Sequence, residues 1–177
     1  MICTPLELEG AYLITLAPVE DERGCFVRNW CAKTFQEWGL NTNFTQFNTS
    51  LNTHSYTLRG LHYQEPPFGE VKLVQCSQGI LFDVIVDLRP DSETYLHHYS
   101  HTLRESQPEM LYIPQGFAHG FLTLEENTQV IYYMDESFYE PEAARGLHWK
   151  DSLLGIEWPA QPQHISERDQ RWESIKK

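Results

Sequence analysis

Apolar side chains recur at every second position or in short runs along much of the chain, as expected of β-strands rather than helices. In the run 80–88, one face would carry only apolar side chains. The other face would carry Asp83 and Asp87 among apolar neighbours. Two acids on a mostly apolar strand indicate an interior that is partly wet.

The same signals predict further strands, separated by turns rich in glycine and proline. The turn Ser77–Gly79 has the size of a hairpin turn, and Pro114–Gly116 is a second turn. Short strands at this spacing, with little helix, indicate an all-β fold, either a jelly roll or a barrel. The further strands are predicted at Tyr12–Ala17, Cys25–Val27, Phe44–Ser50, Val71–Cys76, Glu109–Ile113, Gly120–Leu124 and Gln129–Met134.

Two short helices are predicted beside the strands. The segment Lys33–Trp38 precedes Gly39, a residue type that commonly ends helices. Near the C-terminus, Ser166 followed by Asp169 resembles a capping box, and this helix would run to about Ile175.

The composition narrows the classes of function. The formal net charge of −12 argues against a surface for nucleic acid or an anionic membrane, because both need a basic field. An anionic ligand would therefore need a locally cationic pocket. The four cysteines form no CxxC pair, and neither a leader nor a membrane-length apolar run is present, so we expect a cytoplasmic protein with reduced thiols. No repeat or linker divides the chain, so residues 1–177 are expected to form one domain.

The stretch Thr57–Gln64 combines an arginine and a histidine within an apolar strand. Strict alternation would place Arg59 and His62 on opposite faces, but Gly60 between them can bend the strand or admit a second backbone. Both side chains could then reach one pocket. Taken alone, a histidine in such a strand is more often a hydrogen-bonded core residue than a functional group.

The histidines give little support for a metal site. A metal-binding barrel would need two histidines one residue apart followed by a carboxylate, whereas Gln64 stands two positions after His62. The densest cluster comprises His97, His98 and His101, and an exposed strand or loop face explains it better than a zinc site does. We therefore predict neither a metal nor a cofactor.

Acid–base catalysis is better supported by the sequence. His62 is the natural base, because imidazole titrates near neutral pH. A carboxylate bonded to its other ring nitrogen would fix the tautomer and raise its basicity. Asp83 and Asp169 are both candidates for that carboxylate.

Positive charge and a proton donor are also available. Arg59 and Lys72 could stabilise a developing oxyanion or bind a phosphate, although a lysine at a strand end is commonly a solvated residue. Tyr132 and Tyr133 are adjacent on one predicted strand, so one faces inward and the other outward. One of the two tyrosines would belong to the core, and the other could donate a proton.

Motifs across nearly the whole chain match one family in order. The most specific are Arg59–His62 (RGLH) and, at a distance, Pro114–Phe121 (PQGFAHGF). The other matching segments are Asp21–Phe26, Gln46–Ser50, Lys72–Val74, Asp83–Arg89, Tyr139–Glu142 and Trp149–Asp151. Together they resemble the dTDP-4-dehydrorhamnose 3,5-epimerases, which make the precursor of activated L-rhamnose.

The resemblance implies a metal-free, cupin-like jelly-roll β-barrel that acts on a 4-keto-6-deoxy sugar carried by a nucleoside diphosphate. The C4 ketone acidifies the hydrogens at C3 and C5, so a base can remove them and leave an enolate. The resemblance also implies a homodimer that exchanges N-terminal strands, in which residues 23–28 help to complete the neighbour's site.

The resemblance assigns roles to the catalytic candidates. His62 would be the base, with Asp169 as its partner and Asp83, a residue of the same substrate site, as the other candidate. Lys72, together with Arg59, would stabilise the enolate oxygen.

It also implies a donor and a binding set. Tyr133 is preferred over Tyr132 as the proton donor because it lies six residues before Tyr139, as the family's donor tyrosine does. Tyr139 itself would stack on the thymine. The positions that would hold the nucleotide-sugar are Arg23, Gln46, Asn48, Arg59 and His119.

Three positions in the binding set depart from the family pattern. Arg28 stands where a glutamate is usual, Ala144 where a second acid is frequent, and Arg168 where a lysine is usual. Both arginines would still serve nucleotide-sugar binding. We therefore expect the reaction type to be that of the family, while the nucleotide or the sugar can differ from dTDP-4-keto-6-deoxyglucose. The alternatives are a C3-only epimerase of another nucleotide-deoxysugar and a barrel that binds a sugar nucleotide without turnover.

Overall fold

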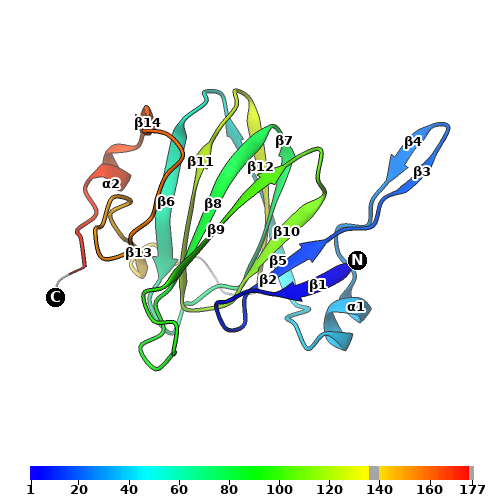
Figure 1. Ribbon diagram of the computed structural model, residues 1–177. Coiled ribbons are helices and arrows are strands. Elements are labelled where there is room, and N and C mark those ends of the chain that lie inside the picture. The colour runs from blue at the N-terminus through cyan, green and yellow to red at the C-terminus, as the bar shows by residue number, and fades with distance from the viewer. Residues whose placement is uncertain (136–139, 176–177) are drawn as a thin grey trace.

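Two β-sheets face each other and form the walls of a barrel (Figure 1). The computed structural model describes residues 1–135 and 140–175. The first sheet has the order β1 (Ile2–Pro5), β2 (Tyr12–Thr15), β10 (Glu109–Ile113), β7 (Lys72–Gln78), β12 (Thr128–Asp135) and β5 (Phe44–Asn52). The second has the order β13 (Ala144–Gly146), β6 (Thr57–Gln64), β11 (Phe117–Thr123), β8 (Ile80–Asp87) and β9 (His98–Arg104), with β14 (His164–Ile165) parallel to β6. This architecture confirms the predicted all-β jelly-roll barrel.

The remaining elements are short. Strands β3 (Val19–Asp21) and β4 (Gly24–Phe26) pair with each other in a hairpin that projects away from the barrel (Figure 1). Helix α1 (Ala32–Glu37) ends just before Gly39, as predicted. Helix α2 (Glu167–Gln170) is capped by Ser166, whose hydroxyl accepts the Asp169 N–H at 3.1 Å.

The C-terminal helix is shorter than the sequence predicts, because it ends at Gln170 rather than near Ile175. Beyond it, the Trp172 ring occupies the space that a side chain at Gly146 would need. Ile175 then donates its backbone N–H to Asp151 at 2.6 Å. These contacts hold the chain against the second sheet and off a helical path.

Apolar side chains form three layers. Between the sheets, the core includes Val74, Leu111 and Val130 of the first sheet and Leu81, Ile85 and Phe121 of the second. The outer face of the first sheet is covered by α1 through Phe35. The outer face of the second is covered by Leu147, Leu154 and Trp158 of the C-terminal segment. The polar cavity described below lies inside the first of these layers.

The turn at Ser77–Gly79 does not make the hairpin that its size suggests. Strands β7 and β8 on either side of it belong to different sheets. Gly79 has a φ of +77°, and a Cβ at this position would lie 2.6 Å from the Thr128 hydroxyl oxygen. The glycine therefore forms a corner at which the chain passes from one sheet to the other.

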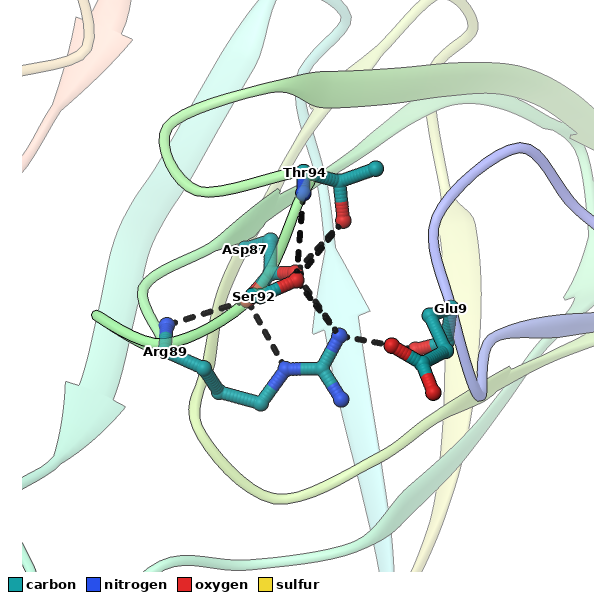
Figure 2. A network of polar contacts seen from close by, with 5 residues as sticks. All are labelled: Glu9, Asp87, Arg89, Ser92 and Thr94. Carbon is teal, nitrogen blue, oxygen red and sulfur yellow. Dashed lines mark hydrogen bonds and ion pairs between the residues drawn. The ribbon is translucent and has the colours of Figure 1, made fainter.

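The two acids predicted on the interior-facing side of β8 are both paired. Figure 2 shows the network around Asp87, which accepts hydrogen bonds from Arg89 at 2.7 Å, Ser92 at 2.6 Å and Thr94 at 2.7 Å. Burial raises the pKa of Asp87, but these hydrogen bonds outweigh it and hold the pKa well below its usual range. Arg89 also donates to the Glu9 carbonyl at 2.8 Å, so the network ties the loop after β8 to the β1–β2 turn.

Candidate active site

A cavity of about 320 Å³ lies between the sheets, with walls from β5, β6, β7, β11 and β12. A groove of about 930 Å³ along residues 162–170 shares Arg59 and His62 with it. The cavity lining includes Asn48, Arg59, His62, Lys72, His119 and Tyr132. Cationic and imidazole groups thus gather inside an acidic chain, as an anionic ligand would require.

Arg59 and His62 share this cavity although an odd number of positions separates them. Gly60 has a φ of +123°, and a Cβ there would lie 2.5 Å from the Gly120 Cα of the neighbouring strand. The pairing of β6 with β11 shifts register between His119 and Phe121, opposite this glycine. The irregularity breaks strict alternation, which confirms that both charged groups reach one pocket.

His62 forms a short contact with Asp169 of α2, with 2.6 Å between its Nε2 and the carboxylate Oδ1. Asp169 is 5% exposed at its side chain and also accepts the Gly60 N–H at 3.2 Å and the Trp172 Nε1–H at 3.3 Å. Burial raises the pKa of Asp169, but these hydrogen bonds, that from His62 foremost, lower it below its usual value. The carboxylate therefore stays ionised and accepts a hydrogen bond from Nε2–H of His62, in the tautomer whose Nδ1 carries the free lone pair.

Asp83, the other candidate partner of the base, pairs with a different histidine. Its two oxygens lie 2.9 and 3.0 Å from Nε2 of His119, and the Asp83 carboxylate is fully buried. His119 lines the cavity and Asp83 contacts it from the buried side, so Asp83 orients His119 rather than His62.

Lys72 is held by a residue that the sequence reasoning missed. Its ammonium lies 3.0 Å from Oε2 of Glu70, and the other oxygen of Glu70 accepts the Gln64 side-chain amide at 2.8 Å. The spacing of Glu70 and Lys72 was the available signal, because residues two apart on an extended chain share a face.

The structure corrects the choice of tyrosine. Tyr132 lines the cavity, whereas Tyr133 packs on the opposite face of β12, with its ring centroid 4.6 Å from that of Phe47. Directly opposed residues in an antiparallel pair share a face, and Tyr132 lies opposite Asn48, which lines the cavity. Burial raises the pKa of Tyr132 well above its usual range, so the phenol keeps its proton at neutral pH.

The family model described as dTDP-4-dehydrorhamnose 3,5-epimerase matches residues 5–177. The chain belongs to this family. It is 40% identical over 173 residues to the dTDP-4-dehydrorhamnose 3,5-epimerase of Methanothermobacter thermautotrophicus, an alignment that covers 96% of this chain and 91% of that protein.

Two solved structures extend the comparison. One is dTDP-6-deoxy-D-glucose-3,5-epimerase from Legionella pneumophila in complex with dTDP-4-keto-L-rhamnose, with a TM-score of 0.92, 32% identity and coverage of 98% of this chain and 92% of that one. The other is a histidine-to-asparagine, tyrosine-to-phenylalanine double mutant of a 3'-monoepimerase from Streptomyces bikiniensis in complex with dTDP. Its TM-score is 0.89 at 28% identity, and the match covers 97% of this chain and 86% of that one.

The family's binding positions mostly lie around the cavity. Arg59 donates from Nε to Asn52 at 2.8 Å, which leaves its terminal nitrogens for a ligand. Asn48 lines the cavity beside Met134, and Gln46, two residues earlier, lies on the same face of β5. Asn52 was missed by the sequence reasoning because nothing in its surroundings marks it.

The departures from the family pattern lie in different places. Arg168 lies at the rim of the groove with its guanidinium over the Trp172 ring, and Ala144 pairs with Gln64 on β6. Arg28 is exposed and follows the β3–β4 hairpin. Tyr139, the predicted thymine-stacking residue of this epimerase family, lies outside the described residues.

Arg23 is not brought to the cavity of its own chain. It lies in the exposed β3–β4 hairpin and pairs with Asp21. Figure 1 shows the hairpin extending away from the barrel wall that carries β6. Arg23 and Arg28 therefore lie apart from the other predicted site residues.

The histidine cluster on β9 has its own structural partners. His101 lies 2.8 Å from Glu109, and within residues 1–135 and 140–175 no three His, Cys, Asp or Glu side chains are grouped as metal ligands would be.

None of the helices in the described part of the chain is long and apolar enough to cross a membrane.

Proposed function

We propose that the chain epimerises C3 and C5 of a nucleoside-diphosphate 4-keto-6-deoxy sugar, converting dTDP-4-dehydro-6-deoxy-D-glucose to dTDP-4-dehydro-L-rhamnose. One observation carries the proposal: His62, the Lys72 ammonium and the Tyr132 phenol line one cavity, and Asp169 contacts the imidazole of His62. The Legionella relative in complex with dTDP-4-keto-L-rhamnose supports the choice of substrate.

The first step is removal of a proton from the carbon beside the ketone. Nδ1 of His62 takes the proton from C3 or C5, while Asp169 stabilises the imidazolium that forms. The electron pair of the broken C–H bond moves onto the C4 oxygen and gives an enolate.

The second step is stabilisation of that enolate. Lys72 is the ammonium in the cavity, and Arg59 is the guanidinium. Fixed positive charge in a cavity between two sheets lowers the energy of the developing oxyanion more than the same charge would in water.

The third step is return of a proton to the opposite face of the sugar. Tyr132 lies on β12 and His62 on β6, in the two sheets that face each other across the cavity. A sugar ring between them meets the base on one face and the phenol on the other, so protonation by Tyr132 inverts the centre. Seventy positions separate His62 and Tyr132, the same interval as between the histidine and tyrosine replaced in the Streptomyces monoepimerase. Every proton is moved by a side chain, so no step calls for a cofactor.

The nucleotide would occupy the rim of the cavity. Arg59 and Arg168 offer guanidinium groups for the diphosphate, with His119 and Asn48 deeper in the wall. Tyr139 remains our candidate for stacking on the thymine of the nucleotide.

We also propose a cytoplasmic location, which the free thiols of the described cysteines fit.

Proton NMR with dTDP-4-keto-6-deoxyglucose in heavy water tests this function. We expect deuterium to enter both C3 and C5, because each inversion removes a carbon-bound hydrogen. Exchange at C3 alone would instead identify a 3-epimerase like the Streptomyces relative. A folded protein that catalyses no exchange would be a barrel that binds without turnover.

We further propose a homodimer in which the β3–β4 hairpin reaches the partner's site. Val19 and Phe26 on the hairpin are 67% and 70% exposed, and Phe47 and Leu51 on the edge strand β5 are 60% and 70% exposed. Large apolar side chains on a projecting hairpin and an open sheet edge are typical of a surface that is covered by a second copy. The exchange would bring Arg23 and Arg28 to a nucleotide.

Mixing two inactive variants tests the exchange. Arg23→Ala and His62→Asn are each expected to impair both sites of their own homodimer. In a mixed dimer, the site with intact His62 receives Arg23 from its partner, so random pairing should restore about a quarter of wild-type activity. If Arg23 served its own chain, the mixture would show no more activity than the parents. Sedimentation velocity on the mixture confirms that dimers are present.

A further inference from the structure

A buried carboxylate, Glu70, lies directly behind the lysine of the proposed site. Its side chain is 4% exposed and that of Lys72 is 13% exposed, and 3.0 Å separates the two charged groups. An ammonium with three donors that gives one to Glu70 retains two for the cavity. The carboxylate therefore fixes a side chain that otherwise has four rotatable bonds.

Glu70 is itself fixed by a second contact. The Gln64 amide donates to Oε1 at 2.8 Å while Lys72 donates to Oε2, so both carboxylate oxygens are occupied. The side-chain carbonyl of Gln64 accepts the backbone N–H of Glu140 at 2.8 Å. Three separate segments thus converge on one ion pair, which is more support than a surface salt bridge has.

The Glu70–Lys72 ion pair lies close to His62, the proposed base. A small void of about 160 Å³ is lined by Glu70, Gln64, Lys72 and His62, so the ion pair borders the proposed base. A buried pair of this kind is weak evidence for stability, because desolvation offsets the attraction between the charges. Its geometry is better explained by the need to hold an ammonium beside a reacting carbonyl.

We infer that Glu70 is a positioning residue, which holds Lys72 at the point where the enolate oxygen forms. This inference rests on the proposed epimerase function. Glu70 does not touch substrate, so its loss should be felt in the rate of enolate formation rather than in nucleotide binding. The nucleotide would be held by Arg59 and other residues of the groove along residues 162–170, and Glu70 does not line that groove.

Glu70→Gln removes the charge and keeps the size and the hydrogen-bonding capacity toward Gln64. We expect kcat to fall about tenfold to a hundredfold, the usual range for losing a hydrogen bond to a charged group. We expect the KM for the nucleotide-sugar to change by less than about threefold, because Glu70 does not contribute to binding of the substrate in its ground state. A drop in melting temperature with unchanged kcat would overturn the inference.

A double-mutant cycle with Lys72→Met separates positioning from a structural role. If Glu70 acts through Lys72, adding Glu70→Gln to Lys72→Met should lower kcat by no more than about twofold. Additive losses would show that Glu70 acts independently of the lysine and would overturn the inference. Should Glu70→Gln fail to fold, Gln64→Met can replace it in the cycle, because it removes the support of Glu70 and leaves both charges in place. We then expect Gln64→Met to lower kcat in the wild-type background and to have little effect on kcat in the Lys72→Met background.

Turnover of the wild-type protein, measured in parallel, distinguishes failure of the proposed epimerase function from failure of the positioning role of Glu70. If the wild-type protein epimerises the substrate and Glu70→Gln is as fast, the function holds and the positioning role is wrong. If the folded wild type turns over no 4-keto-6-deoxy sugar nucleotide, the proposed function is wrong and the inference that rests on it falls as well.

Discussion

His62→Asn is expected to lower kcat by about 10³- to 10⁴-fold, the upper range for losing a general base. Asparagine keeps a polar side chain in the cavity but has no nitrogen that accepts a proton near neutral pH. The KM should change by less than about threefold, because the contacts to the nucleotide are retained. Steady-state kinetics and deuterium exchange at C3 and C5 both measure this loss.

The chain offers a matched control for this variant. His101 also faces a carboxylate, Glu109 at 2.8 Å, but it lies on β9 outside the cavity. His101→Asn should therefore leave kcat close to that of the wild type. If kcat fell equally in the two variants, the loss would come from damage to the fold when a histidine–carboxylate pair is broken, and His62 would not be the base.

Tyr132→Phe is expected to lower the rate of inversion by about 10²- to 10³-fold, because the enolate then lacks its acid on the face opposite His62. Exchange of the substrate's hydrogens with solvent should continue, since His62 still removes a proton and returns it to the same face. NMR in heavy water distinguishes the two events, because it reports deuterium incorporation and product configuration separately.

Tyr133→Phe is the matched control on the neighbouring position. Its ring packs with Phe44 and Phe47 on the other face of β12, so phenylalanine should fit with little change in rate. A large loss of inversion in Tyr133→Phe, with Tyr132→Phe unaffected, would return the donor role to Tyr133.

Local patterns predicted most of the strands, because alternation and glycine turns are properties of short segments. They failed where the partner of a strand decides the outcome. Strand β9 (His98–Arg104) carries many polar residues, so its periodicity is weak, and its pairing with β8 is what orders it. The residues around Gly79 identify a turn, but they do not indicate that the chain changes sheets there.

The site shows the same division. Motifs made His62, Lys72 and Asp169 candidates, and the structure shows that Asp169 contacts His62 while Asp83 contacts His119. Choosing between Tyr132 and Tyr133 needed the register of β12 against β5, which spacing to another tyrosine does not supply. Glu70 has the spacing from Lys72 that places two residues on one face of an extended chain, but it precedes β7 in a connecting segment where this alternation is not assured, so the structure was needed to establish the contact.

The position of Asp169 outside the two facing sheets bears on how the site is assembled. Strand β14 and helix α2 follow the strands of both sheets in the sequence, and β14 pairs with β6 at Thr57 and Leu58. A product terminated before them would keep Arg59, Lys72 and Tyr132 but would leave His62 without its carboxylate. Cleavage by a protease before β14 would thus remove both the carboxylate that pairs with His62 and the Arg168 guanidinium at the rim of the groove.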